Sequence, residues 1–159
     1  MKKNQKIYIA GQEGMVGSAI FRLLMKRYIY MGLFDKIFGG ETTKKEEKVL
    51  PWIFLTSESQ LEEIEKKSFN KPQVIFKHST RCSISSISMN KFVANYSIPE
   101  DDADIYYLDL LNYRSVSDEV GFKFQVMHQS PQIIVIKDGV AVYNASHYDI
   151  QVEKIVELI

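Results

Sequence analysis

The stretch VIFKHSTRCSIS, Val74 to Ser85, decides how this sequence of 159 residues is interpreted. It begins as an apolar run, which predicts a buried β-strand. It then changes to hydroxyl residues around Cys82, the only cysteine of the chain. The continuation CSISSISMNKFVANY places Ile84, Ile87 and Phe92 at near-helical spacing, although its serines are weak helix formers. We therefore expect a strand that leads into a helix, with Cys82 at the junction.

Similar patterns extend on both sides of this stretch. The expected strands are WIFLT (52–56), QVIFKHS (73–79), DIYYLDLL (104–111) and the two arms of the hairpin QIIVIKDGVAVYNAS (132–146). The expected helices are SESQLEEIEKKS (57–68), CSISSISMNKFVANY (82–96), RSVSDEVGFKF (114–124) and YDIQVEKIVELI (148–159). The order β-α-β-α-β-α-β-β-α over roughly a hundred residues predicts one compact α/β domain.

Three short signals set expected boundaries within this order. In SESQLEEIEKKS, a hydroxyl residue precedes Gln60 or Glu62 by three places, which is a capping-box pattern. Ser115 or Ser117 is expected to open the helix in RSVSDEVGFKF. Asp138-Gly139 is expected to form the hairpin turn.

Composition excludes several classes of protein. Lys and Arg number 20 and Asp and Glu number 20, so no net field attracts nucleic acid or an anionic membrane. No run approaches the ~18 apolar residues of a membrane helix, and the glycine-rich N-terminus does not resemble a secretory signal. A single cysteine rules out an intramolecular disulfide. We expect a cytoplasmic protein, with neither nucleic acid nor membrane as a partner.

The position of Cys82 favours a reactive thiolate. The first turn of a helix has unpaired N–H groups and a positive partial charge, and such a position lowers a cysteine pKa from about 8.5 to roughly 3.5–7.5. Arg81 adds positive charge, as Lys77 and His78 do if they point the same way, and Thr80, Ser83 and Ser85 can donate hydrogen bonds to the sulfur. Free cysteines are also among the most buried residues, so a space-filling Cys82 stays open at this point.

A second feature is HQSPQ (128–132), which immediately precedes the strand QIIVIK. Proline is acceptable at the first residue of a strand, and a cis Ser130–Pro131 bond could bring backbone groups against a facing loop. The alternative is an ordinary trans proline in a loop.

Several separated motifs resemble the YtxJ-type monothiol bacilliredoxins, which have a thioredoxin-like fold. They are PWIFLTSESQLEEI, VIFKHSTRCSIS, YYLDLLNYRSVSDEV, VMHQSPQ and NASH, and the resemblance spans about residues 50–159. It implies a central mixed sheet flanked by helices, Cys82 as the redox cysteine and Pro131 as a cis-proline. It also implies removal of bacillithiol from mixed disulfides on proteins.

The single cysteine then limits the mechanism. A dithiol thioredoxin resolves its mixed disulfide with a second cysteine three residues on, and here that position is Ser85. Cys82 could take over a small thiol from a protein mixed disulfide and then needs an external thiol to regenerate it. No tightly bound cofactor is expected. The expected site has Cys82 as the catalytic residue, with a substrate-binding group around it: Thr80, Arg81, Ser85, Ser130 and Pro131.

The remaining polar residues near these motifs are less specific. Lys77, Arg81 and His128 could contact an acidic part of the small thiol, although surface charges of this kind usually serve solubility. His78, His128 and His147 are too scattered for a metal site, and we expect hydrogen-bonded structural roles for them. We expect no metal.

The front of the chain does not match the rest. KIYIAGQEGMVGSAI has the spacing G-x-x-G-x-x-G after a strand and resembles the first βα unit of GDP-fucose synthase-like short-chain dehydrogenases, over about residues 1–28. The acidic residue expected about 20 residues on is missing, and MGLFDKIFGG looks like a fresh start at Met31. We expect a truncated Rossmann-like fragment (1–30), a linker (31–50) and a thioredoxin-like domain (51–159).

Three functions are compatible with these patterns. The first is a monothiol thiol–disulfide oxidoreductase, with protein mixed disulfides and a low-molecular-weight thiol, bacillithiol by resemblance, as its partners. The second is a non-catalytic thioredoxin-like module for protein interaction, in which Cys82 is inert. The third is a dinucleotide-binding remnant.

Overall fold

A computed structural model describes residues 50–159 of the chain. The expected Rossmann-like fragment and all of the expected linker except its last residue lie outside the described residues. That last residue, Leu50, is buried in the core of the domain that follows.

The described elements follow the expected order along the chain. The strands are β1 (Trp52–Phe54), β2 (Gln73–His78), β3 (Asp104–Asp109), β4 (Gln132–Lys137) and β5 (Val140–Ser146). The helices are α2 (Ser59–Lys67), α3 (Ser83–Asn95), α4 (Arg114–Lys123), the 3₁₀ turn η1 (His147–Asp149) and α5 (Val152–Val156). The predicted α/β arrangement is confirmed, and so is the strand that runs into a helix on either side of Cys82.

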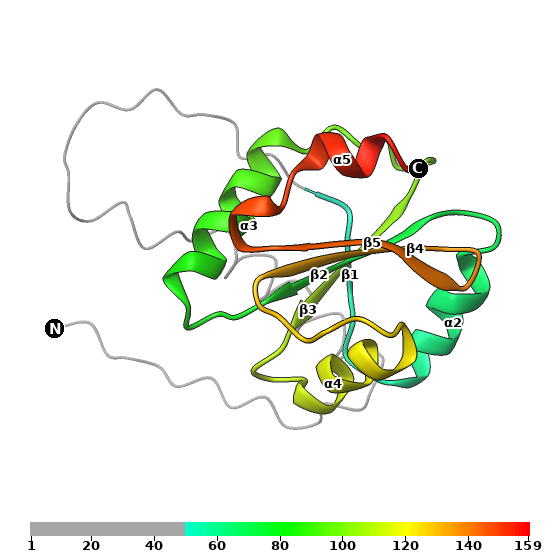
Figure 1. The fold of residues 1–159 in the computed structure, drawn as a ribbon, viewed down its shortest axis with the longest axis horizontal. Helices are drawn as coiled ribbons and strands as arrows, with labels where there is room; N and C mark the ends of the chain where they lie inside the picture. The colour runs from blue at the N-terminus through cyan, green and yellow to red at the C-terminus, as the bar shows by residue number, and fades with distance from the viewer. Residues whose placement is uncertain (1–49) are drawn as a thin grey trace, which may run out of the picture. The chain divides into compact units, whose positions relative to one another are not determined.

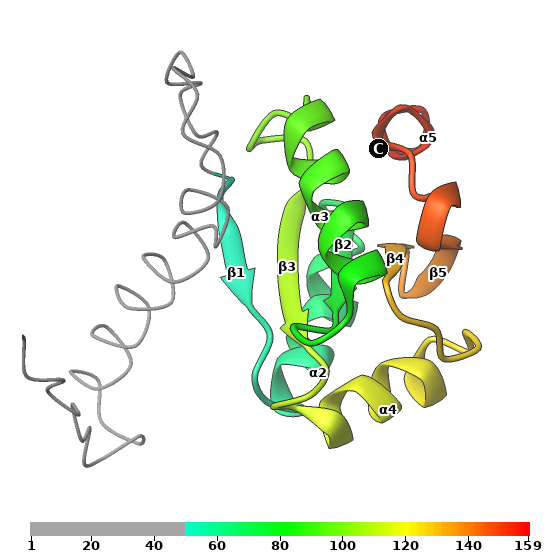
Figure 2. The same cartoon turned by 90° about the vertical axis from the view of Figure 1, so that its left-hand side faces the viewer.

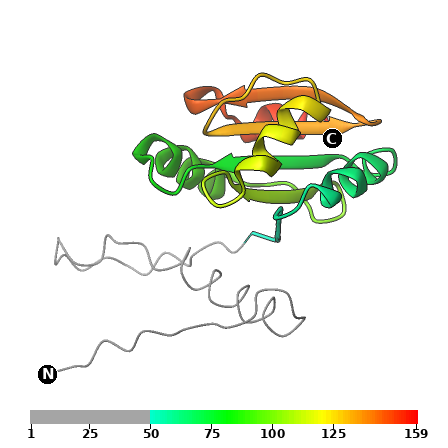
Figure 3. The same ribbon diagram turned by 90° about the horizontal axis from the view of Figure 1, so that it is seen from below.

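The five strands form one mixed sheet in the order β1-β3-β2-β4-β5. Strand β3 pairs in parallel with β1 and β2, whereas β4 is antiparallel to both β2 and β5. In Figure 1, α3 and α5 lie above the sheet and α2 and α4 lie below it. Figure 3 shows the sheet from below, with α4 crossing in front of its strands. This is the mixed sheet flanked by helices that the resemblance implied.

Each face of the sheet has its own apolar core. Met89, Phe92 and Ile155 of α3 and α5 pack on one face, and Leu61, Ile64 and Val120 of α2 and α4 pack on the other. Every residue of β2 is buried, so its alternation shows only in which core each residue joins. Val74 and Phe76 face α3, and Ile75 faces α4. The polar residues that follow, Lys77 and His78, therefore point to opposite faces.

The capping signals were partly right. Gln60 at the start of α2 accepts hydrogen bonds from the backbone N–H groups of Thr56 and Ser57, at 2.8 and 3.0 Å, so one half of the expected capping box forms. The expectation for α4 is wrong, because its N-cap is Tyr113 and no side chain caps it. In the turn before α4, the Asp109 carboxylate accepts the Leu111 N–H at 3.0 Å, and the helix begins at Arg114, one residue before Ser115.

The last helix is shorter than expected. The chain first makes the 3₁₀ turn η1, and Ile150 and Gln151 then have extended backbone, so α5 begins only at Val152. Of the apolar residues Ile150, Ile155 and Leu158 in this stretch, the first two are buried and Leu158 is half-buried.

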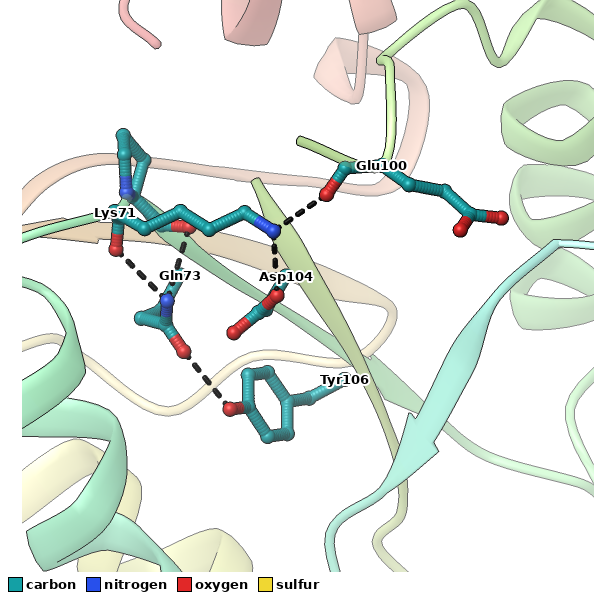
Figure 4. A network of polar contacts seen from close by, with 6 residues as sticks. Lys71, Gln73, Glu100, Asp104 and Tyr106 are labelled. Atoms are coloured by element: carbon teal, nitrogen blue, oxygen red, sulfur yellow. Dashed lines mark hydrogen bonds and ion pairs between the residues drawn. The ribbon is translucent and has the colours of Figure 1, made fainter. Parts of the chain in front are cut away.

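A polar network joins the amino ends of β2 and β3, at the end of the strands opposite to Cys82 (Figure 4). Lys71 Nζ donates to the Glu100 carbonyl and, at 2.9 Å, to Asp104 Oδ1. The buried Gln73 side chain accepts from Tyr106 Oη at 2.8 Å and donates to the Lys71 carbonyl at 2.7 Å. This network joins the two strands by side chains where their ladder begins.

The hairpin turn confirms the Asp138-Gly139 signal. Both residues have positive φ, 53° and 80°, as a type I′ turn requires. The turn also rests on the end of α2, because Ser68 Oγ accepts the Gly139 N–H at 2.8 Å.

We predict that Gly139→Ala destabilises the domain by about 1–2 kcal/mol, because an L side chain is strained at this φ. A Cβ there would also lie 2.9 Å from Cζ of Phe69, which must then move. Urea unfolding measures the loss. Asp138→Gly is the matched control in the same turn: it relieves a positive φ and is expected to cost less. Equal stability of Gly139→Ala and the native protein would contradict the strain argument.

Candidate functional site

Cys82 lies at the N-cap of α3, where β2 has just ended. Its backbone is extended (φ −108°, ψ 120°), and its carbonyl accepts the first bonds of the helix from Ser86 N at 3.1 Å and Ser86 Oγ at 3.3 Å. The Cys82 N–H donates to the Ser79 carbonyl at 3.1 Å. The residue is half-buried and its thiol is free. Cys82 thus stands beside the unpaired N–H groups of the first turn, partly open to solvent.

The sheet topology brings the segment around Pro131 to the same end of the sheet as Cys82. Because β2 and β4 are antiparallel with Lys77 opposite Gln132, the end of β2 lies beside the start of β4. Figure 2 shows the start of α3 and the segment entering β4 at the same end of the sheet. The Ser130–Pro131 peptide bond is cis, as the resemblance implied. Pro131 is therefore placed at the end of the sheet where β2 ends and the turn with Cys82 begins.

The turn η1 connects these two segments. The His147 N–H donates to the Pro131 carbonyl at 3.1 Å, and the His147 carbonyl accepts from Ser88 Oγ of α3 at 3.0 Å. A continuous chain of hydrogen bonds therefore runs from the cis-proline to the helix that begins at Cys82.

His78 and Ser85 support the cysteine turn from inside. Both are buried, and Ser85 Oγ lies 2.8 Å from His78 Nδ1 while it accepts the Ser79 N–H at 2.9 Å. Burial lowers the pKa of His78, and the charge of Asp109 opposes this only in part. His78 is therefore neutral near pH 7, and Ser85 fixes the end of β2 to the first turn of α3.

Lys77 faces the other side of the sheet and is fully buried. Its Nζ lies 3.2 Å from the Ser117 carbonyl of α4 and 2.9 Å from His128 Nδ1. Burial lowers the pKa of Lys77 to about 8; Asp118 raises this pKa and Arg114 lowers it, both by smaller amounts. Lys77 is a charged group inside the domain, held by a helix and by the loop before Pro131.

These positions change how the expected positive charges act. Lys77 does not reach the surface and His78 is neutral, so neither is placed to contact an acidic substrate. Thr80 and Arg81 are exposed beside Cys82. Ser85 points inward to His78, which makes it a support for the turn rather than a surface contact. Ser130 Oγ is buried and has no hydrogen-bond partner within residues 50–159.

The helix at Cys82 was predicted correctly from a pattern that was partly misread. Phe92 is buried, but Ile84 and Ile87 are 38% and 55% exposed. The buried face carries Ser85 and Ser88 in their place, because each serine has a polar partner on a neighbouring element. The two isoleucines leave apolar surface just after the cysteine.

We predict that Ser85→Ala lowers the free energy of unfolding by about 1–3 kcal/mol, because His78 Nδ1 and the Ser79 N–H lose their partner inside the protein. Urea denaturation measures this. Ser83→Ala, at an exposed neighbouring serine, is the control and is expected to change stability by no more than about 0.5 kcal/mol. Two variants of equal stability would contradict the supporting role of Ser85.

Within residues 50–159, no cluster of three or more His, Cys, Asp or Glu side chains is arranged to hold a metal ion. No helix in that range is long and apolar enough to cross a membrane.

The fold and this site define a thioredoxin-fold oxidoreductase. The chain is 34% identical to a protein assigned as an oxidoreductase with a thioredoxin fold, with a TM-score of 0.57, over 67% of this chain and 91% of that one. It also shares the fold of Malassezia sympodialis thioredoxin (Mala s 13), at 19% identity and a TM-score of 0.51, over 65% of this chain and 84% of that one.

The family follows from the sequence itself. Residues 53–155 match the model of the monothiol bacilliredoxin BrxC family. The chain belongs to that family, and it is a thiol–disulfide oxidoreductase.

Sequence reasoning missed the internal support of this site. Lys77 directly follows the apolar run 74–76 of its strand, and a buried ion requires a partner, which is the one signal that was available. Its partner His128 lies 51 residues further along the chain. Only the fold shows that they meet.

Proposed function

We propose that this protein removes bacillithiol from mixed disulfides on other proteins, with Cys82 as the nucleophile. The observation that supports this most is the setting of the chain's only cysteine at the start of α3, with Ser85 in the place of a resolving thiol. One reactive sulfur at an open helix start can accept a small thiol, but cannot eject it unaided.

The first step is a thiol–disulfide exchange. The Cys82 thiolate attacks the bacillithiol sulfur of the protein–S–S–bacillithiol bond. A new S–S bond forms between Cys82 and bacillithiol, and the client protein leaves as a thiolate that takes a proton from solvent.

The second step regenerates Cys82. An external low-molecular-weight thiolate attacks the bound bacillithiol sulfur, which forms a small disulfide and releases the Cys82 thiolate. The external thiol is oxidised and the mixed disulfide is reduced, so the electrons balance. The cycle needs a small thiol as co-substrate and a compartment that keeps thiols reduced, for which the cytoplasm is suitable.

The substrate group consists of Thr80, Arg81, Ser130 and Pro131, with Ser85 beneath them. Arg81 is exposed next to Cys82 and supplies a positive charge that can pair with an acidic group on the small thiol. The backbone at Pro131 lies at the same end of the sheet as Cys82 and can contact the extended chain of a client protein. Ile84 and Ile87 offer apolar surface to the same client.

Paired substrates test the choice of small thiol. One client protein is prepared with bacillithiol and, separately, with glutathione on the same cysteine, and the initial rates of client release are compared. The proposal expects a higher kcat/KM for the bacillithiol form. Equal values would refute bacillithiol selectivity while leaving the oxidoreductase activity intact.

A non-catalytic interaction module is the alternative. In that case Cys82 reacts slowly with an alkylating reagent in the folded protein, and neither substrate loses its small thiol. Rapid alkylation together with turnover that depends on Cys82 excludes the alternative.

A further inference from the structure

His128 is an exposed residue of the loop before Pro131 whose ring contacts the interior of the domain. It is exposed and lies three residues before Pro131, yet its Nδ1 is 2.9 Å from Nζ of the fully buried Lys77. The neighbouring backbone is held on both sides. Gln132, which pairs with Lys77 across the strands, donates to the Met127 carbonyl at 2.9 Å and accepts the Gln129 N–H at 3.2 Å. The His128 ring is thus held by its contact with Lys77, and the backbone on either side of His128 is held by the Gln132 side chain.

The contact with Lys77 determines the tautomer of His128. The pKa of Lys77 is about 8, so its side chain is mostly an ammonium at neutral pH. An ammonium can donate hydrogen bonds but cannot accept them. Burial and the Lys77 charge lower the pKa of His128, so its ring is neutral. Nδ1 must then accept from Lys77, and the ring proton must be on Nε2. Because Nδ1 faces inward on an exposed residue, the Nε2–H is left on the solvent side.

We propose that Lys77 is a positioning residue that holds His128 as the Nε2–H tautomer, so that His128 donates a hydrogen bond to an acceptor on the mixed disulfide bound at Cys82. This inference rests on the proposed function, because that function places the substrate beside Pro131. It gives a role to a buried cation that the exchange steps do not use.

The charges around Lys77 set the pH range of this arrangement. Asp118 and Arg114 of α4 face it with opposite signs, and His128 faces it from the loop. As the pH rises through about 8, Lys77 loses its charge and its amine can also accept a hydrogen bond. Both tautomers of His128 then become accessible, and the contribution of His128 to kcat/KM is expected to fall.

Two-bond ¹H–¹⁵N NMR spectra of the reduced full chain test the tautomer without turnover. We expect the Nε2–H form for His128 at pH 7 and a mixture of tautomers in Lys77→Met. Lys71→Met is the matched control. It removes a lysine with two polar contacts just before the start of β2, the strand that ends with Lys77 and His78, and it leaves His128 unchanged. An Nδ1–H form in the native protein would overturn the inference, as would an unchanged tautomer in a folded Lys77→Met variant.

Kinetics test the contact with substrate and do not depend on the folding of Lys77→Met. His128 is exposed and Lys77 keeps the Ser117 carbonyl as a partner, so His128 variants are expected to fold. We expect His128→Ala to lower kcat/KM by about three- to tenfold, the range for one hydrogen bond, mainly through KM. His128→Gln, which keeps an inward acceptor and an outward donor, should recover most of the loss. The native advantage over His128→Ala should shrink above pH 8.

Failure of the proposed function and failure of the inference about His128 give different results. If Cys82→Ala matches the native rate of client release, the proposed function fails, and the substrate contact of His128 fails with it. If Cys82→Ala is inactive but His128→Ala keeps the native kcat/KM, the inference alone is refuted.

Discussion

Cys82→Ser will abolish transfer of the small thiol, with a loss of at least about 10³-fold in the rate of client release. The thiolate is the nucleophile in disulfide exchange, and a serine hydroxyl is not ionised to any useful extent near pH 7. Residues 50–159 hold no second cysteine that could substitute for Cys82, and the whole chain has only this one. The rate is measured by the appearance of the free client thiol.

The fold should tolerate this substitution. Cys82 is only half-buried, and serine is a favourable residue at an N-cap. The variant should therefore keep the urea midpoint of the native protein, which makes it a clean test of chemistry. A folded Cys82→Ser protein that still releases the client at the native rate would rule out Cys82 as the nucleophile.

Ser85→Cys will convert the one-thiol cycle into a two-thiol cycle. Residues three apart at the start of a helix are neighbours on one face, and disulfides join residues whose Cα atoms are about 4.4–6.8 Å apart. After Cys82 has taken over the small thiol, the new thiolate attacks the Cys82 sulfur. The small thiol leaves, and a disulfide forms between positions 82 and 85. The native protein should accumulate the mixed disulfide when no external thiol is present, whereas the variant should not.

Intact mass distinguishes the two products, because the variant's internal disulfide is two hydrogens lighter than its reduced form. Ser97→Cys is the matched control, since it places the same thiol at an exposed serine beyond the other end of α3. It should accumulate the mixed disulfide as the native protein does. Mixed disulfide persisting on Cys82 in Ser85→Cys at the native level would show that position 85 cannot reach the sulfur.

The order of elements was predictable because buried strands and tight turns have local causes. The central residues of β2 and β4, 74–76 and 133–136, are all apolar since both faces of these strands are covered, and Asp138-Gly139 supplies the positive φ values of the turn. The junction at Cys82 was likewise visible as an apolar run followed by hydroxyl residues. These features need no knowledge of distant residues.

The remaining features depend on partners far apart in the sequence. Ser85 and Ser88 are buried on α3 because His78 and the His147 carbonyl meet them there, so a count of apolar residues favours the wrong face. Lys77 is buried because Ser117 and His128 lie over the same face of the sheet. Periodicity shows which residues are apolar, but the pairing of polar groups is decided by the tertiary fold.

The central claim is that Cys82 itself carries the small thiol between the two steps. The most direct measurement is intact mass spectrometry, with mapping of the modified peptide, after the reduced protein meets one equivalent of bacillithiolated client without any other thiol. The account predicts one added bacillithiol, located on Cys82, and a matching amount of free client thiol. An unmodified Cys82 alongside a released client, or a client that keeps its bacillithiol, would contradict it.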